Sequence, residues 1–151
     1  MVKMGDIVKA VNGLVVELFP DDPVYVNFMP KDFKRPSTLI EFADCERTDA
    51  NISTVEVKAK FSLTCYTEVD GHYLADTERL NDRLDATAAL FACGYVRVGD
   101  RCLEAKAVSA GTDITDCYID LQLDYFDDRP GAEDAPPAAE SIETAIKEQE
   151  E

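Results

Sequence analysis

Basic residues are scarce in this chain of 151 residues: 15 Lys and Arg stand against 31 Asp and Glu, and the formal net charge is -16 at pH 7. Non-specific binding to nucleic acid and docking on anionic lipid both need a basic surface, so the composition argues against both. Long apolar runs are also missing. No apolar stretch approaches the ~20 residues that cross a bilayer, and the N-terminus shows no apolar segment with a cleavage site, so we expect neither a membrane anchor nor a secretory signal.

Side chains suited to metal or redox chemistry are few. The five cysteines include no C-x-x-C pair, so we expect reduced thiols, as in a reducing cytoplasm. The only histidine, His72, lies among acids in a loop, where a solvated side chain is the usual state and a metal site lacks a second histidine. Residues 94–101 (GYVRVGDR) lack the Lys-Ser/Thr of a phosphate loop and indicate a hairpin turn. We therefore predict no catalytic residue, metal or cofactor, and no enzymatic activity.

Hydrophobic periodicity predicts an α+β domain over residues 1–130. Apolar residues recur at three- and four-residue steps over 4–18 and 76–93, which is typical of helices with one buried stripe. Alternation over 55–65 and 117–125 indicates strands with one buried and one wet face.

Shorter strands are expected nearby. They cover residues 24–29, 39–46 and 95–108, the last interrupted by a turn or bulge at Gly99-Asp100. The predicted fold is a mostly antiparallel sheet of about five strands with two helices packed on one face, in the order α-β-β-β-α-β-β.

The C-terminal segment has a different composition. Residues 127–151 hold nine acids and two bases, with three prolines and few large apolar side chains. Such a segment buries too little apolar surface to offset its ordering entropy. We therefore expect residues 131–151 to form an acidic, disordered tail.

The most basic stretch is a loop, PKDFKRPS, over residues 30–37. It has two readings, a solvated loop or a docking loop with an aromatic anchor and flanking cations that pair with acids of a neighbouring chain. In the second reading the contact residues on the loop and at the end of the last strand are Lys31, Phe33, Lys34, Arg35, Asp127, Asp128 and Arg129.

Two further acids, Asp120 and Asp124, fall on one face of the last strand. They read as solvated charges, as a catalytic carboxylate pair, or as acids that line a channel for another polyanion. Solvated charge is the default on the wet face of a sheet. The channel reading gives a reason for like charges to gather there.

Several stretches together resemble the tail terminator family of phages and prophages of Gram-positive bacteria. They are the opening MVKMGDIVKAVNG, Val24–Asn27 with PKDFKRPSTLIEF, GYVRVGDR, and YIDLQLDYFDDRP over residues 118–130. The resemblance implies a structural protein of the virion tail, assembled in the host cytoplasm. It implies a hexameric ring that caps the head-proximal end of the tail tube, stops its polymerisation and gives the head a joining surface.

The partners implied by the resemblance are further copies of the chain, the tail tube protein, the head–tail connector or neck protein and, in a contractile tail, the sheath. DNA would pass through the ring without specific binding, and Asp120 and Asp124 would face that lumen. Two other functions remain open: a neck or connector component of the same particle, and an acidic DNA mimic that blocks a basic protein.

Overall fold

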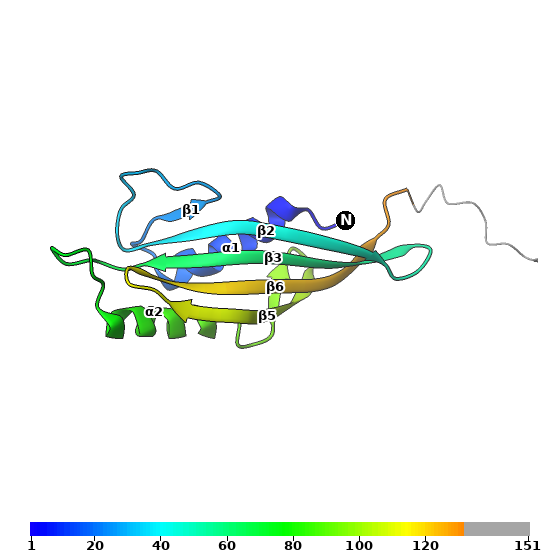
Figure 1. Cartoon of the computed structure of the whole chain (residues 1–151). Helices are drawn as coiled ribbons and strands as arrows, with labels where there is room; N and C mark the ends of the chain where they lie inside the picture. The colour runs from blue at the N-terminus through cyan, green and yellow to red at the C-terminus, as the bar shows by residue number, and fades with distance from the viewer. Residues whose placement is uncertain (132–151) are drawn as a thin grey trace, which may run out of the picture.

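Two amphipathic helices cover one face of a six-stranded sheet in the computed structural model, which describes residues 1–131 (Figure 1). The elements in chain order are α1 (Met4–Leu18), β1 (Val24–Val26), β2 (Ser37–Asp49), β3 (Thr54–Tyr66), α2 (Thr77–Ala89), β4 (Tyr95–Val98), β5 (Arg101–Thr112) and β6 (Asp116–Asp128). Neither helix in residues 1–131 is long and apolar enough to cross a membrane. The predicted acidic tail, apart from Gly131, lies outside the described residues.

The strand order across the sheet is β1-β2-β3-β6-β5-β4. All neighbours are antiparallel except β1 and β2, which run parallel. The α+β class is confirmed, but the prediction of five antiparallel strands is wrong in detail.

Two local features explain the difference. Gly99 has a φ of 62°, and Val98 pairs with Arg101, so Gly99-Asp100 is the two-residue turn of a hairpin that splits 95–108 into β4 and β5. The long loop over residues 27–36 carries the chain back beside its own start, so that β2 runs parallel to β1. The order is therefore α-β-β-β-α-β-β-β.

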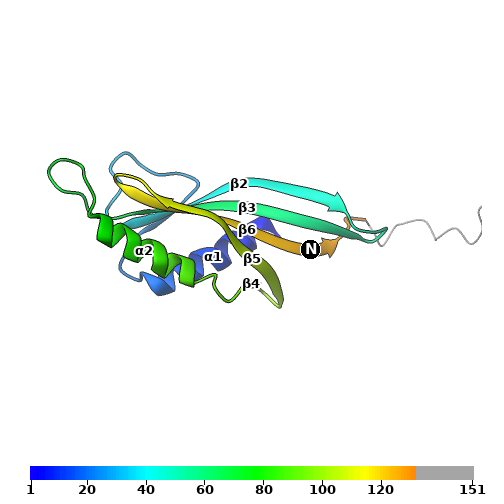
Figure 2. The same ribbon diagram turned by 60° about the horizontal axis from the view of Figure 1, so that its bottom comes forward.

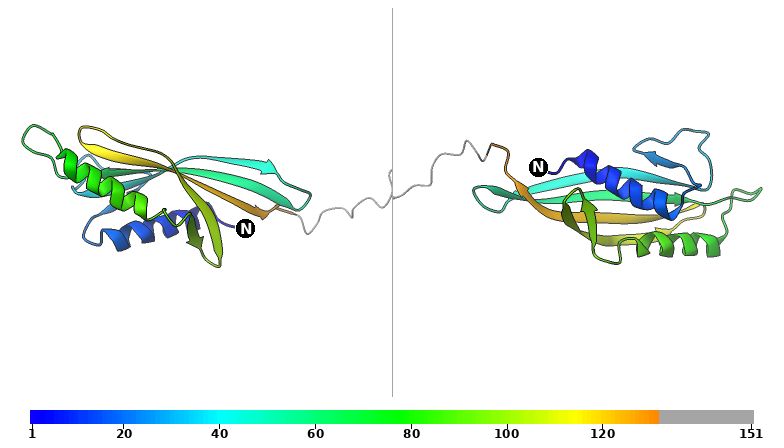
Figure 3. Two further views of the ribbon diagram at one scale, coloured as in Figure 1. Left: turned by 90° about the horizontal axis from the view of Figure 1, so that it is seen from below. Right: turned by 180° about the vertical axis from the view of Figure 1, so that it is seen from behind.

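The core lies between α1 and the sheet. Ile7, Val11 and Val15 are fully buried, and their spacing places them on one side of the helix, as the periodicity predicts. They pack against the alternate residues of the central strands that point the same way, such as Phe61 and Leu63. Figures 2 and 3 show both helices on the same side of the twisted sheet.

Helix α2 covers the end of the same face. Asp76 caps it by accepting a hydrogen bond from the backbone N–H of Glu78 at 3.0 Å, which is the usual role of an aspartate at this position. Leu80 packs over Cys65 and Cys117, which lie opposite each other on β3 and β6 and carry free thiols. The two cysteines therefore lie on the apolar side of their strands, as the alternation predicts. No second layer covers the opposite face of the sheet over most of its length in the described residues (Figure 2).

Candidate functional site: assembly surfaces of the subunit

The basic loop folds over one end of the sheet face that the helices leave bare. Tyr66 lies on that face because its neighbour Cys65 points into the core. The ring of Phe33 lies 4.9 Å from the ring of Tyr66, and the guanidinium of Arg35 is 5.0 and 5.2 Å from these two rings. Phe33 and Arg35 are therefore used within the subunit, where they hold the loop against the sheet.

Arg35 is the anchor of this loop. Its Nη1 donates hydrogen bonds of 3.0 Å to the backbone oxygens of Thr67 and Thr115, which follow β3 and precede β6. The guanidinium thus joins three segments that are far apart in the sequence. Lys31 and Lys34, by contrast, are exposed on the loop.

We expect Arg35→Ala to release the loop, because it removes both hydrogen bonds and both ring contacts. The free energy of unfolding should fall by about 2 kcal/mol, given the cost of losing hydrogen bonds to a charged group. Cleavage by a lysine-specific protease after Lys31 and Lys34 should accelerate. Lys34→Ala is the matched control and should leave stability and cleavage after Lys31 unchanged; equal effects of the two variants would contradict the anchoring role.

The bare face carries a mixed but negative charge. We define it by the outward-pointing residues of the four central strands, and it holds nine acids and three bases, for a net charge of -6. These are Glu41, Asp44, Glu46, Glu56, Glu104, Asp116, Asp120, Asp124 and Asp128, with Lys58, Lys60 and Lys106.

Asp120 and Asp124 both lie on the bare face, but in different surroundings. Asp124 accepts hydrogen bonds from Lys106 Nζ at 3.2 Å and from Gln122 Nε2 at 2.7 Å, and its side chain is only 14% exposed. It lines a hollow of about 530 Å³ between β3, β5 and β6. Asp120 lies opposite Ser62 and Ser109 in the register. The two acids are four residues apart on β6 and have different neighbours on β3 and β5, so their carboxylates do not form a pair.

The end of β6 is tied into the subunit. Asp127 is 5% exposed, and its carboxylate accepts hydrogen bonds from the backbone N–H of Val2 at 2.9 Å and from Arg101 Nη1 at 3.0 Å. Arg129 forms an ion pair of 2.7 Å with Asp49 of the β2–β3 hairpin. Of the three acidic and basic residues that we predicted here for an interface, only Asp128 is left exposed.

These contacts lower the pKa of Asp127. Burial acts in the opposite direction, but the N–H groups of Val2 and Asp128, the Arg101 guanidinium and the terminal amine favour the charged carboxylate and outweigh it. A lowered pKa in the folded state means that the charged form stabilises the fold above the unfolded pKa. That contribution is lost as the pH falls through the folded pKa.

We expect Asp127→Asn to lower the melting temperature at pH 7 by a few degrees, because it removes the carboxylate that holds the N-terminus and Arg101. The gap to the native protein should begin to close as the pH falls below about 4, the ordinary pKa of an aspartate in the unfolded chain. It should vanish only below the lowered pKa of the folded protein, where Asp127 itself takes up a proton. Melting curves between pH 7 and pH 3 test this. Asp128→Asn is the control, and a gap that is the same at every pH would contradict the assignment.

A buried arginine, Arg83, joins α2 to the start of the chain. Its Nη1 forms an ion pair of 2.7 Å with Asp22, its Nη2 donates to Thr38 Oγ1 at 3.1 Å, and its guanidinium lies 3.9 Å from the ring centre of Phe19. The side chain is only 8% exposed. The sequence carries a signal for it, because Arg83 falls three residues after Leu80 on the apolar stripe of α2, but the partner Asp22 is 61 residues away.

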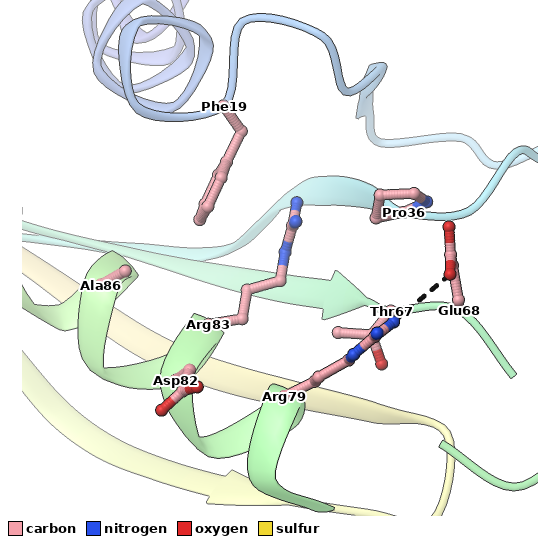
Figure 4. Close-up of a pocket in the computed structure, with 8 residues that line it drawn as sticks. All are labelled: Phe19, Pro36, Thr67, Glu68, Arg79, Asp82, Arg83 and Ala86. Atoms are coloured by element: carbon pink, nitrogen blue, oxygen red, sulfur yellow. Dashed lines mark hydrogen bonds and ion pairs between the residues drawn. The ribbon is translucent and has the colours of Figure 1, made fainter. Parts of the chain in front are cut away.

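Arg83 forms one wall of an open pocket of about 350 Å³ (Figure 4). Arg79 also lines the pocket and donates to Glu68 at 3.4 Å, so that the pocket lining holds charges of both signs. In residues 1–131 no three His, Cys, Asp or Glu side chains are grouped so that they could hold a metal ion. The pocket lies where α2 packs against the segment that follows α1.

We expect Arg83→Met to destabilise the subunit by about 3–5 kcal/mol, because Asp22 and Thr38 would lose a buried charged partner. Arg79→Met, one turn earlier on the same helix, is the matched control. Its exposed ion pair with Glu68 should contribute less than about 1 kcal/mol. Chemical denaturation of the two variants measures the difference, and losses of similar size would contradict the role of Arg83.

The described residues thus present a charged bare sheet face and a basic loop that is tethered to one end of it. The chain belongs to the phage tail terminator family: the family described as phage tail terminator protein matches residues 6–135. This confirms the resemblance seen in the sequence and supports a structural role in completing a phage tail. No curated protein matches the chain.

Proposed function

We propose that six copies of this chain form a ring that caps the head-proximal end of the tail tube, stops its polymerisation and provides the surface that joins the head connector. Family membership supports a role in tail completion. The observation that carries the ring arrangement is the bare, charged face of a twisted sheet whose other face is closed by two helices (Figure 3).

In the proposed ring the bare face lines the lumen and the helices lie outside. Six copies of a face with net charge -6 give the lumen -36 in total. Such a wall repels DNA phosphates, so that DNA passes without specific binding. Asp120 and Asp124 belong to this wall, and Lys106 reduces its charge locally beside Asp124.

The basic loop is the proposed contact with a second chain. Lys31 and Lys34 project from it, while Arg35 and Phe33 hold it in place. Because the subunit as a whole is strongly acidic, these cations suit an acidic patch on the next subunit or on the tail tube. Asp128 is the exposed acid at the far end of β6 that suits a basic partner.

The double variant Lys31→Glu/Lys34→Glu tests this function, because it reverses the loop charge and keeps the Arg35 anchor. We expect folded protein, but tails of uncontrolled length or tails that do not join heads, as seen by electron microscopy of the particles. Lys3→Glu/Lys9→Glu, at the exposed N-cap and on the exposed side of α1, is the matched control and should give normal tails. Normal length and joining in the loop variant would show that the loop is solvated.

A further inference from the structure

Two stretches of the sheet have an edge without a neighbouring strand. Strand β1 pairs only with residues 38–40 of β2 (Figure 1). Beyond this pairing, the backbone N–H of Phe42 donates a hydrogen bond to the side-chain oxygen of Asn27. Strand β4 pairs only with residues 101–104 of β5. Within residues 1–131, no strand lies against the outer side of residues 43–49, the β2 edge, or of residues 106–112, the β5 edge.

The two edges differ in charge. The β2 edge (ADCERTD) holds three acids and one base, a net charge of -2, whereas the β5 edge (KAVSAGT) holds one base and no acid, a net charge of +1. Pairing like with like would oppose -2 to -2 or +1 to +1. Pairing the β2 edge with the β5 edge of another copy is the only combination of the two that brings opposite charges together.

The directions of the strands also fit this combination. β2, β3, β6 and β5 are successive antiparallel neighbours, so that β2 and β5 run in opposite directions. Two copies in the same orientation, side by side, would therefore place the β2 edge of one antiparallel to the β5 edge of the other. Such a contact joins two different surfaces, and repeated by rotation it closes a ring.

The edges lie diagonally across the sheet. Residues of β3 serve as a scale along the strands. The β2 edge lies beside residues 55–60 of β3, whereas the β5 edge, followed across β6, is in line with residues 60–65 of β3. They overlap only if the neighbour is displaced along the strands by about four to six residues, roughly 13–20 Å at ~3.3 Å per residue. The same displacement moves β1 of one copy and β4 of the next beyond the paired edges, so that neither strand blocks the contact. A stagger of this kind is what tilts the strands of a closed sheet.

Each edge also carries a β-bulge, between Phe42 and Asp44 and between Ala107 and Ser109. Bulges protect edge strands from indiscriminate pairing. Because the bulges weaken each edge as a pairing partner, we expect the two edges to pair only where the assembled ring holds them side by side.

We propose that the β2 edge of each subunit pairs with the β5 edge of the next, so that the six sheets form one continuous wall around the lumen. This inference rests on the proposed ring and names the surfaces that would close it. Since side chains on one face must stay on one face, the displacement is an even number of residues. A displacement of four places Cys45 opposite Ala110 of the neighbour, and a displacement of six places it opposite Thr112.

Disulfide trapping tests the pairing with the full chain. The exposed Cys93 and Cys102 are replaced by serine, Cys45 is kept, and Ala110→Cys or Thr112→Cys is added. Mild oxidation of the variants assembled on tails should give a ladder of up to six linked chains on a denaturing gel for one of the two. Asp85→Cys, on the exposed side of α2, replaces the β5 cysteine as the matched control and should give none.

The outcomes separate this inference from the proposed function. Rings seen by electron microscopy on tails of both variants, with no linked chains from either, would overturn the edge pairing and leave the ring intact. A product that stops at two chains would overturn the edge pairing, because a head-to-tail contact does not end there. Protein that folds, as judged by its melting curve, but forms no ring on tails that carry it would contradict both.

Discussion

The pairing of β3 with β6 over thirteen residues sets the arrangement of the whole subunit. In this register Val57, Ala59, Phe61 and the later residues on the same face of β3 lie opposite the apolar residues of β6. The two lysines between them, on the other face, lie opposite Asp124 and Gln122. A slip of one residue would turn every side chain to the other face. The core under the helices and the charged bare face are thus two consequences of one register.

The few arginines of this acidic chain act mainly inside the subunit. Arg35 closes one end of the bare face, Arg83 fixes α2 to the segment after α1, and Arg101 and Arg129 secure the end of β6. Each one satisfies backbone oxygens or carboxylates that would otherwise remain without a charged partner. The lysines of the described residues, by contrast, remain at or near the surface, where they reduce the negative charge of the bare face and give the basic loop its positive charge.

Elements with a clear period could be predicted from the sequence. The apolar stripe of α1, the alternation in β3 and β6 and the cap at Asp76 are all local patterns, and the structure has them where the patterns place them. The parallel pairing of β1 could not be predicted, because it depends on the path of a ten-residue loop. The division of residues 95–108 into β4 and β5 could be predicted, because Gly99-Asp100 is a dipeptide typical of two-residue hairpin turns.

The candidate surfaces could be predicted only in part. The loop was visible as a basic stretch between two prolines, but Phe33 and Arg35 face Tyr66 and Thr115, partners 33 and 80 residues away. Asp127 looked like a surface acid, and its partner Val2 is 125 residues away. Partners this far apart in the sequence leave no local signal. Only the structure therefore shows which charged residues are engaged within the subunit and which remain exposed for contacts with other chains.

The central claim is that this chain forms the last ring of a tail, with its bare sheet face toward the DNA. A cryo-electron microscopy map of the head-proximal end of the tail tests it most directly. We predict six copies around the axis, with Asp120 and Asp124 lining the lumen and the helices outside. A single copy or a dimer at this position, or a ring with α1 and α2 toward the lumen, would contradict the account.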